Sequence, residues 1–153
     1  MPKSPFDREL AVTADVKQCW RTLTDVPLLV SWISVIEDAR EIAPLERYSA
    51  VLMDRLGPFR LRADLDIRLR DVEVGRHVHV AASGEDRQVG SRLVVEADLD
   101  LTEEPPAGSR VRVAGSYEVT GRVASMGSAT IRKKADKILD EFFANVANTL
   151  GAD

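Results

Sequence analysis

The sequence predicts an α+β fold in which a curved, antiparallel, seven-stranded sheet packs against one long C-terminal helix, with two short helices after the first strand. Three observations lead to this prediction. Residues 128–150 repeat apolar side chains at the spacing of an amphipathic helix, and residues 35–119 alternate apolar and polar side chains as strands do. The strands follow one another closely and are joined by short turns, which is typical of an antiparallel meander.

The C-terminal helix is the longest element that the pattern predicts. At about 100° per residue, its apolar side chains fall within an arc of roughly 140°. This arc consists of Ile131, Ala135, Ile138, Leu139, Phe142, Phe143, Val146 and Leu150. From Ser128 to Leu150 the helix would be about 34 Å long, nearly the full width of a single domain of this size. A helix of that length with one apolar face needs a broad apolar partner, and the sheet supplies one.

The N-terminal part of the chain predicts one strand followed by two short helices. Residues 5–12 alternate and form the first strand. Thr13 or Asp15 can then cap a short helix, and Pro27 fits the first turn of a second helix over residues 28–33. Two such brief helices cannot form a core by themselves, so we expect them to lie against the sheet.

The rest of the sheet is predicted from alternation alone. The clearest strand is 59–70, where apolar residues alternate strictly with Arg and Asp, so that one face is buried and the other is solvated. The Ser-Gly-Glu-Asp-Arg-Gln-Val-Gly stretch at 83–90 predicts a turn or loop. The other expected strands cover residues 35–43, 48–56, 76–83, 93–101 and 111–119.

Length and composition limit the classes of protein to consider. A chain of 153 residues is expected to form one domain over residues 1–153, and 44% hydrophobic and 30% charged residues are ordinary for a soluble globular protein. The net charge of −4 argues against a nucleic-acid partner. No apolar run approaches the roughly 20 residues of a transmembrane segment. The single cysteine, Cys19, fits a reducing compartment, so we expect a cytoplasmic protein.

The predicted sheet presents more inward surface than one helical stripe can cover. Small residues at mid-strand, Ala63, Ala97 and Gly115, leave further room on the inward face. We therefore expect an elongated apolar pocket between sheet and helix, roofed by the two short helices. The expected lining residues are Trp32, Leu52, Leu65, Ile67, Val80, Leu93, Val95, Tyr117, Val119, Met126, Ile138 and Phe142. The alternative, in which these residues simply pack against one another, stays open.

Three segments carry a resemblance to a known family. They are the Trp-Arg-Thr-Leu-Thr-Asp stretch within residues 16–25, the Gly-Arg-Val-Ala-Ser-Met-Gly stretch at 121–127, and the Phe142-Phe143 pair. Together they make the chain resemble, over nearly its whole length, the family of the CoxG subunit of carbon monoxide dehydrogenase. This family is part of the helix-grip (SRPBCC) superfamily, which includes START domains, the birch-pollen-allergen fold and polyketide cyclases.

The resemblance implies a helix-grip fold that binds a hydrophobic small molecule, quinone- or lipid-like, without catalysis. It also implies a protein partner, since the family serves oxidoreductases such as molybdenum hydroxylases. Two departures stand out. Residues 32–35 read Trp-Ile-Ser-Val where the family has Cys-Ile/Leu-Pro-Gly, so the pocket mouth should differ. The chain ends at Asp153, before any C-terminal extension of the kind linked to membrane attachment, so no membrane-recruiting role is expected.

Few residues in the sequence are candidates for catalysis or metal binding. His77 and His79 project to the same side of a strand and could supply two metal ligands, but no third ligand accompanies them, so we expect them to face solvent and to bind no metal. The sequence gives no sign of a histidine near Cys19 that could activate it as a nucleophile. We therefore expect Cys19 to be a buried structural thiol. No cofactor is expected.

A cyclase- or aromatase-like enzyme using the same cavity remains the alternative function. Such an enzyme needs only a few polar groups inside the cavity, and Tyr117 and, depending on the register of the strand, Asp54 or Arg55 are the residues that could supply them. We expect the Asp54 carboxylate to be solvated, however, because it precedes the turn at Gly57 and an unpaired buried carboxylate is costly. Ligand identity and oligomeric state stay open.

Overall fold

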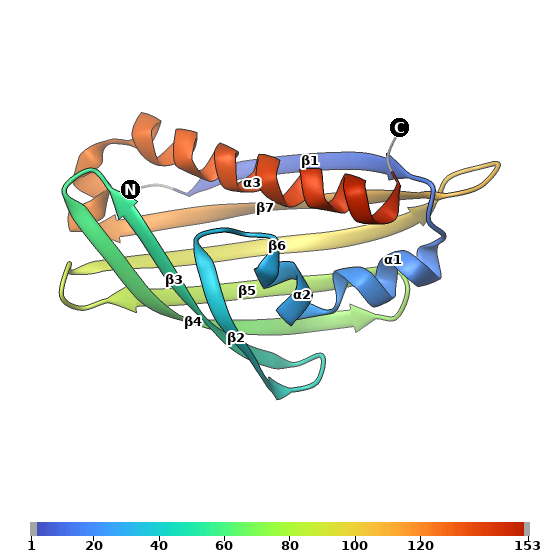
Figure 1. Cartoon of the computed structure of the whole chain (residues 1–153), viewed down its shortest axis with the longest axis horizontal. Helices are drawn as coiled ribbons and strands as arrows, with labels where there is room; N and C mark the ends of the chain where they lie inside the picture. The colour runs from blue at the N-terminus through green and yellow to red at the C-terminus, as the bar shows by residue number, and fades with distance from the viewer. Residues whose placement is uncertain (1–2, 152–153) are drawn as a thin grey trace.

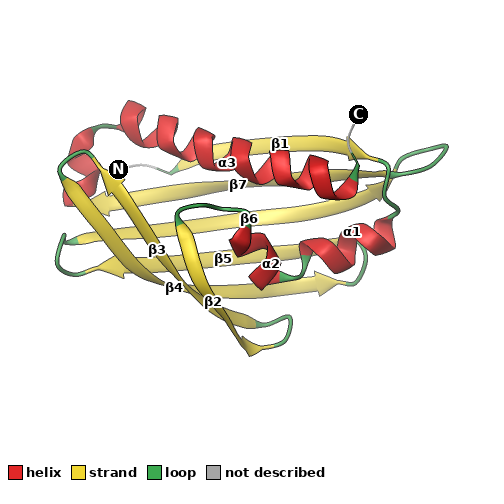
Figure 2. Cartoon of the chain, in the orientation of Figure 1, coloured by secondary structure: helices red, strands yellow, loops and turns green. Residues whose placement is uncertain are grey.

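A computed structural model describes residues 3–151 and confirms the predicted α+β architecture (Figure 1). In chain order the elements are β1 (Ser4–Val12), α1 (Val16–Leu23), α2 (Val26–Ser31), β2 (Ile36–Ala43), β3 (Arg47–Leu56), β4 (Phe59–Glu73), β5 (His77–Asp86), β6 (Ser91–Glu103), β7 (Ser109–Gly121), the 3₁₀-helix η1 (Arg122–Met126) and α3 (Ser128–Leu150). The strands form one antiparallel sheet in the order β1-β7-β6-β5-β4-β3-β2. All three α-helices lie on the same, concave face of this sheet (Figure 2).

The long helix α3 spans the residues that its periodicity predicts. Gly127, with φ of 95°, precedes it, and Gly151, in the left-handed conformation with φ of 81°, ends it. Glycine adopts such positive φ angles without steric cost. The backbone N–H of Thr13 donates to the carbonyl of Gly151 at 2.8 Å, and that of Ala14 donates to Leu150 at 3.0 Å. The C-terminal end of α3 is therefore fastened to the connection between β1 and α1.

The two short helices begin at their capping carboxylates. Asp15 and Asp25 each accept the backbone N–H three residues farther on, which satisfies a donor that has no partner within the helix. Pro27 lies in the first turn of α2, as predicted. The predicted start of α2 at residue 28 is two residues late, because Asp25 caps the helix ahead of the proline.

The predicted loop at 83–90 is wrong in its first half, since β5 continues to Asp86. The Asp86 side chain is only 6% exposed, and it accepts the backbone N–H of Arg62 at 2.7 Å, of Gln88 at 3.0 Å and of Val89 at 3.1 Å. These hydrogen bonds join β4 to the turn after β5. The polar composition suggested a loop, but pairing with β4 and β6 decides the structure.

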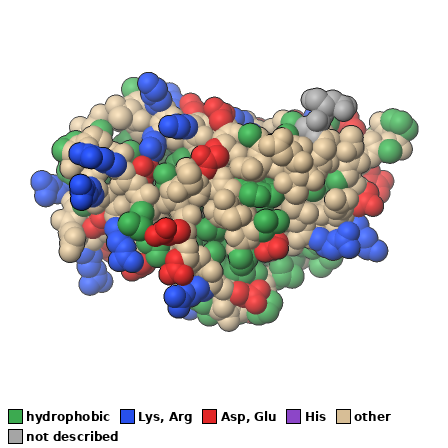
Figure 3. All heavy atoms as spheres, in the orientation of Figure 1, with side chains coloured by type: hydrophobic (Ala, Val, Ile, Leu, Met, Phe, Trp, Pro, Cys, Tyr) green, Lys and Arg blue, Asp and Glu red, His purple; other side chains and the backbone are tan. Residues whose placement is uncertain are grey.

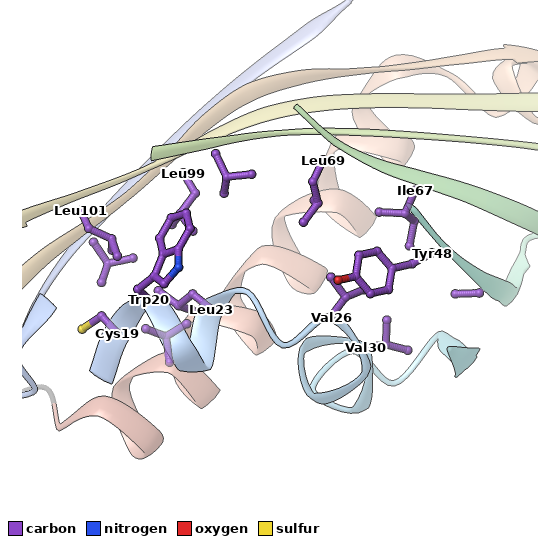
Figure 4. Close-up of a cluster of buried hydrophobic side chains, with 14 of the residues drawn as sticks. Cys19, Trp20, Leu23, Val26, Val30, Tyr48, Ile67, Leu69, Leu99 and Leu101 are labelled. Atoms are coloured by element: carbon purple, nitrogen blue, oxygen red, sulfur yellow. The ribbon is translucent and has the colours of Figure 1, made fainter. Parts of the chain in front are cut away.

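A solid core fills the end of the concave face beneath α1 and α2 (Figure 4). From the two helices, Cys19, Trp20, Leu23, Val26 and Val30 point toward the sheet and meet Tyr48, Ile67, Leu69, Leu99 and Leu101. Cys19 is fully buried, in agreement with the prediction, and burial raises the pKa of its thiol. Within residues 3–151, no helix is both long and apolar enough to cross a membrane.

Candidate functional site: an apolar trough beneath α3

The middle of the concave face is not fully covered by α3. At one end of the helix Val146 and Leu150 are buried in the core, and at the other end Ile131 is buried. Between these points, apolar side chains on both the sheet and the helix remain partly exposed. We call this region the apolar trough; it consists of Leu61 on β4, Val80 and Ala82 on β5, Leu93, Val95 and Ala97 on β6, Val113, Gly115 and Val119 on β7, and Ala135, Ile138, Leu139 and Phe142 on α3.

The residues of the trough are all partly exposed. In Figure 3, hydrophobic side chains reach the surface of this face between the charged residues of α3 and those of β2 and β3. Two shallow hollows on the described surface lie elsewhere. One, of about 200 Å³, is lined by Val94 and Glu96 among others, and the second, of about 560 Å³, runs along the charged outer side of α3 past Lys133 and Lys137. Charged side chains line much of both hollows, whereas the trough residues themselves are all apolar.

The predicted lining residues fall into three groups. Leu52, Leu65 and Ile67 are buried in the core and meet other core side chains. Six more belong to the trough as defined above: Val80, Leu93, Val95, Val119, Ile138 and Phe142.

Of the remaining three, Trp32 and Met126 lie at its margins, while Tyr117 lies between Gly115 and Val119 on β7 but is buried. Trp32 ends α2, Met126 lies against Gly57 in the β3–β4 turn, and the ring of Tyr117 stacks on Phe6 with their centroids 6.4 Å apart. Contact of any of the predicted lining residues with a ligand stays a prediction.

One flank of α3 reaches across the trough to the β2 end of the sheet. The Glu141 carboxylate accepts hydrogen bonds from the backbone N–H of Ser34 and from its hydroxyl, the latter at 3.0 Å. Asn145 donates to the carbonyl of Trp32 at 3.3 Å, and the rings of Trp32 and Phe142 lie 5.9 Å apart. We call these five residues the Ser34 clasp. Residues 32–35, where the sequence departs from the family pattern, therefore include two residues that contact α3 directly, Trp32 and Ser34.

A second link between β3 and α3 corrects the prediction for Asp54. Its carboxylate is largely buried and paired rather than freely solvated: the side chain is 12% exposed and lies 3.1 Å from the Lys134 ammonium, itself 29% exposed. Asp54 pairs with Leu61 across the strands and shares the concave face, so the carboxylate needs a partner there. The sequence interpretation placed Lys134 outside the apolar arc and missed this contact. A signal existed, because Lys134, Ile138, Glu141 and Asn145 lie three or four residues apart on one flank.

The opposite flank of α3 is held against β1. Arg8, which the alternation places on the apolar side of its strand, reaches Asp140 at 2.6 Å and Asp136 at 3.8 Å. Polar contacts therefore link both flanks of α3 to the sheet, and the trough lies between them.

The histidine pair lies on the convex face, away from the trough. His77 and His79 are half-buried, with Nδ1 of each 2.8 Å from the carboxylates of Asp100 and Asp98, respectively. The hydrogen bond with Asp100 raises the pKa of His77. Both rings lie on the face opposite Val78 and Val80, as predicted, and they are 21% and 22% exposed because carboxylates of β6 lie beside them. Among residues 3–151, no group of three or more potential ligands is placed to hold a metal ion.

Comparison with known proteins identifies the family that this chain matches. Residues 9–151 match the family model that describes the CoxG subunit of carbon monoxide dehydrogenase, in agreement with the resemblance seen in the sequence. Among curated proteins, none matches this chain. A conserved protein from Geobacillus kaustophilus is similar in structure, with a TM-score of 0.81, 22% identity, and coverage of 97% of this chain and 95% of that chain.

Two other solved structures are similar at lower identity. A START superfamily protein from Mycobacterium smegmatis has a TM-score of 0.69 and 10% identity, covering 95% of this chain and 96% of its own. A protein from Chromobacterium violaceum has a TM-score of 0.66 and 10% identity, covering 97% and 99%. At these identities the similarity shows the fold alone.

Proposed function

This chain belongs to the CoxG family of carbon monoxide dehydrogenase subunits, and from that premise we propose that it binds a hydrophobic small molecule in the apolar trough without catalysing a reaction on it. The proposed ligand is quinone- or lipid-like, and the protein serves an oxidoreductase, such as a molybdenum hydroxylase, as an accessory. The family's description supports an oxidoreductase partner.

One observation carries this proposal: partly exposed apolar side chains line both walls of one concave region. Covering such surface with an apolar ligand contributes about 2.5 kcal/mol for each 100 Å² removed from water. Association itself costs at least about 4 kcal/mol in lost translational and rotational freedom. A ligand must therefore cover several hundred Å² of surface, which a long hydrocarbon chain or a ring with a tail does in an elongated trough.

Two neighbouring valines on β6 provide the test. Val95 points into the trough, whereas Val94 points to the convex face and lines the hollow there, and both are partly exposed. In fluorescence titrations with the neutral apolar probe N-phenylnaphthylamine, Val95→Lys should weaken binding by about tenfold or more, because a charge enters the apolar wall. Val94→Lys, the matched control, should bind as the wild type does.

Two results would overturn the proposal. Equal binding by both variants would place the probe outside the trough. Failure of the wild type to take up the probe, together with native mass spectra that show no retained apolar ligand and no thermal shift across a panel of quinones and lipids, would remove the proposed function altogether.

A further inference from the structure

The Asp54–Lys134 pair is continuous with the apolar trough. Leu61, the cross-strand partner of Asp54, belongs to the trough, and so does Ile138, one helical turn after Lys134. A molecule lying along the trough can therefore bring one of its ends to this ion pair.

The ion pair retains hydrogen-bonding capacity. Oδ1 of Asp54 lies 3.1 Å from the Lys134 ammonium and accepts the backbone N–H of Arg55 at 2.8 Å. Among the described residues, Oδ2 accepts no hydrogen bond from the protein, and the Lys134 ammonium, which has three protons to donate, has Asp54 as its ion-pair partner. Since no fully buried side-chain N or O atom in this part of the chain lacks a partner, Oδ2 is in contact with solvent. A ligand can replace that solvent with its own donor and acceptor.

The net charge of the pair is zero, and this limits the head groups that fit. A carboxylate beside the pair would gain from Lys134 and lose to Asp54, while an ammonium would do the reverse. In both cases the charged ligand gives up its hydration without net compensation. An uncharged group with one donor and one acceptor can satisfy both residues at once.

We propose that Asp54 and Lys134 are the polar end of the ligand site and select amphipathic molecules with an uncharged head that both donates and accepts a hydrogen bond, such as an alcohol or a hydroxy-carbonyl group. This inference rests on the proposed function, since it requires a ligand in the trough. The inference adds the chemical class of the ligand's head group and names Asp54 and Lys134 as the residues that select it.

Three ligands with one tail provide the test: lauryl alcohol, lauric acid and laurylamine, competing with N-phenylnaphthylamine for the full chain at neutral pH. The wild type should prefer the alcohol. Asp54→Asn leaves Lys134 unopposed, so lauric acid should gain about tenfold relative to the alcohol, as expected for a charge-assisted hydrogen bond. Lys134→Met leaves Asp54 unopposed, so laurylamine should gain instead, and the acid should lose.

Two controls separate this selection from a general charge effect. Asp66→Asn removes the same charge on the convex face, where Asp66 lies 3.0 Å from both Arg47 and Arg68, and it should leave the ranking of the ligands unchanged. The exchanged pair, Asp54→Lys with Lys134→Asp, restores neutrality and should restore the preference for the alcohol.

The ways in which the test can fail are distinct. A wild type that binds neither the probe nor any lauryl compound contradicts the proposed function. A wild type that binds them, with a ranking that stays the same in Asp54→Asn and Lys134→Met, contradicts this inference alone. A shift in Asp66→Asn equal to that in Asp54→Asn would also contradict it.

Discussion

Removing the Ser34 clasp should speed the release of ligand from the trough. Glu141→Ala deletes a carboxylate that accepts two hydrogen bonds from Ser34, at a position where α3 reaches across to the β2 end of the sheet. Hydrogen bonds to a charged group are worth about 1.5–3 kcal/mol when buried. These bonds are exposed, however, so we expect a total loss of about 1–2 kcal/mol. This loss destabilises the conformation in which Ser34 and Glu141 are in contact, so the conformation in which that contact is broken becomes about 5- to 30-fold more populated.

Stopped-flow dissociation of N-phenylnaphthylamine measures this effect directly. The dissociation rate should rise by a factor in that range in Glu141→Ala and by less in Ser34→Ala, which keeps the backbone N–H. Asp140→Ala is the matched control, because Asp140 is the next residue on α3 but contacts Arg8 on the β1 flank. A dissociation rate that is unchanged in Glu141→Ala, or raised equally in Asp140→Ala, would show that the clasp does not gate the trough.

Two further predictions concern stability. Backbone N–H donors hold the pKa of the Asp86 carboxyl below its ordinary value of about 3.9. Asp86→Asn should therefore lower the free energy of unfolding by about 2–3 kcal/mol at neutral pH, and its difference from the wild type in urea titrations should shrink as the pH falls below about 4; a difference independent of pH would contradict this. The Asp100 carboxylate raises the pKa of His77 above about 6.5. The stabilising contribution of His77 is therefore complete below that pH and is lost as the pH rises through the higher, folded-state value. His77→Gln should differ most from the wild type in thermal unfolding near pH 6 and least at alkaline pH, and the opposite trend would refute the assignment.

Periodicity predicted the elements whose partners are broad and apolar. The 128–150 helix matches α3 at both ends, because its apolar stripe and its flanking glycines agree. The 59–70 strand lies wholly within β4, since strict alternation occurs only where one face is buried. The end of β5 could not be predicted in the same way. Its residues 83–86 are polar or glycine, and only their pairing with β4 and β6, which are distant in the sequence, makes this segment a strand.

The polar parts of the candidate site were harder to predict than its apolar walls. Alternation placed Val80, Val95 and their neighbours on the inward face, where the structure has them. The contacts of Asp54 with Lys134 and of Ser34 with Glu141 join residues 80 and 107 positions apart, and they depend on how far α3 stands from the sheet. A local pattern carries no information on that distance.

Methyl-resolved NMR during titration with lauryl alcohol tests the trough most directly. We predict that the largest chemical-shift changes occur at Val80, Val95 and Ile138, on both walls, while Val94 on the convex face is unaffected. Changes centred on Val94, or no changes at any of these methyl groups at saturating ligand, would contradict the claim that this chain binds apolar molecules between its sheet and α3.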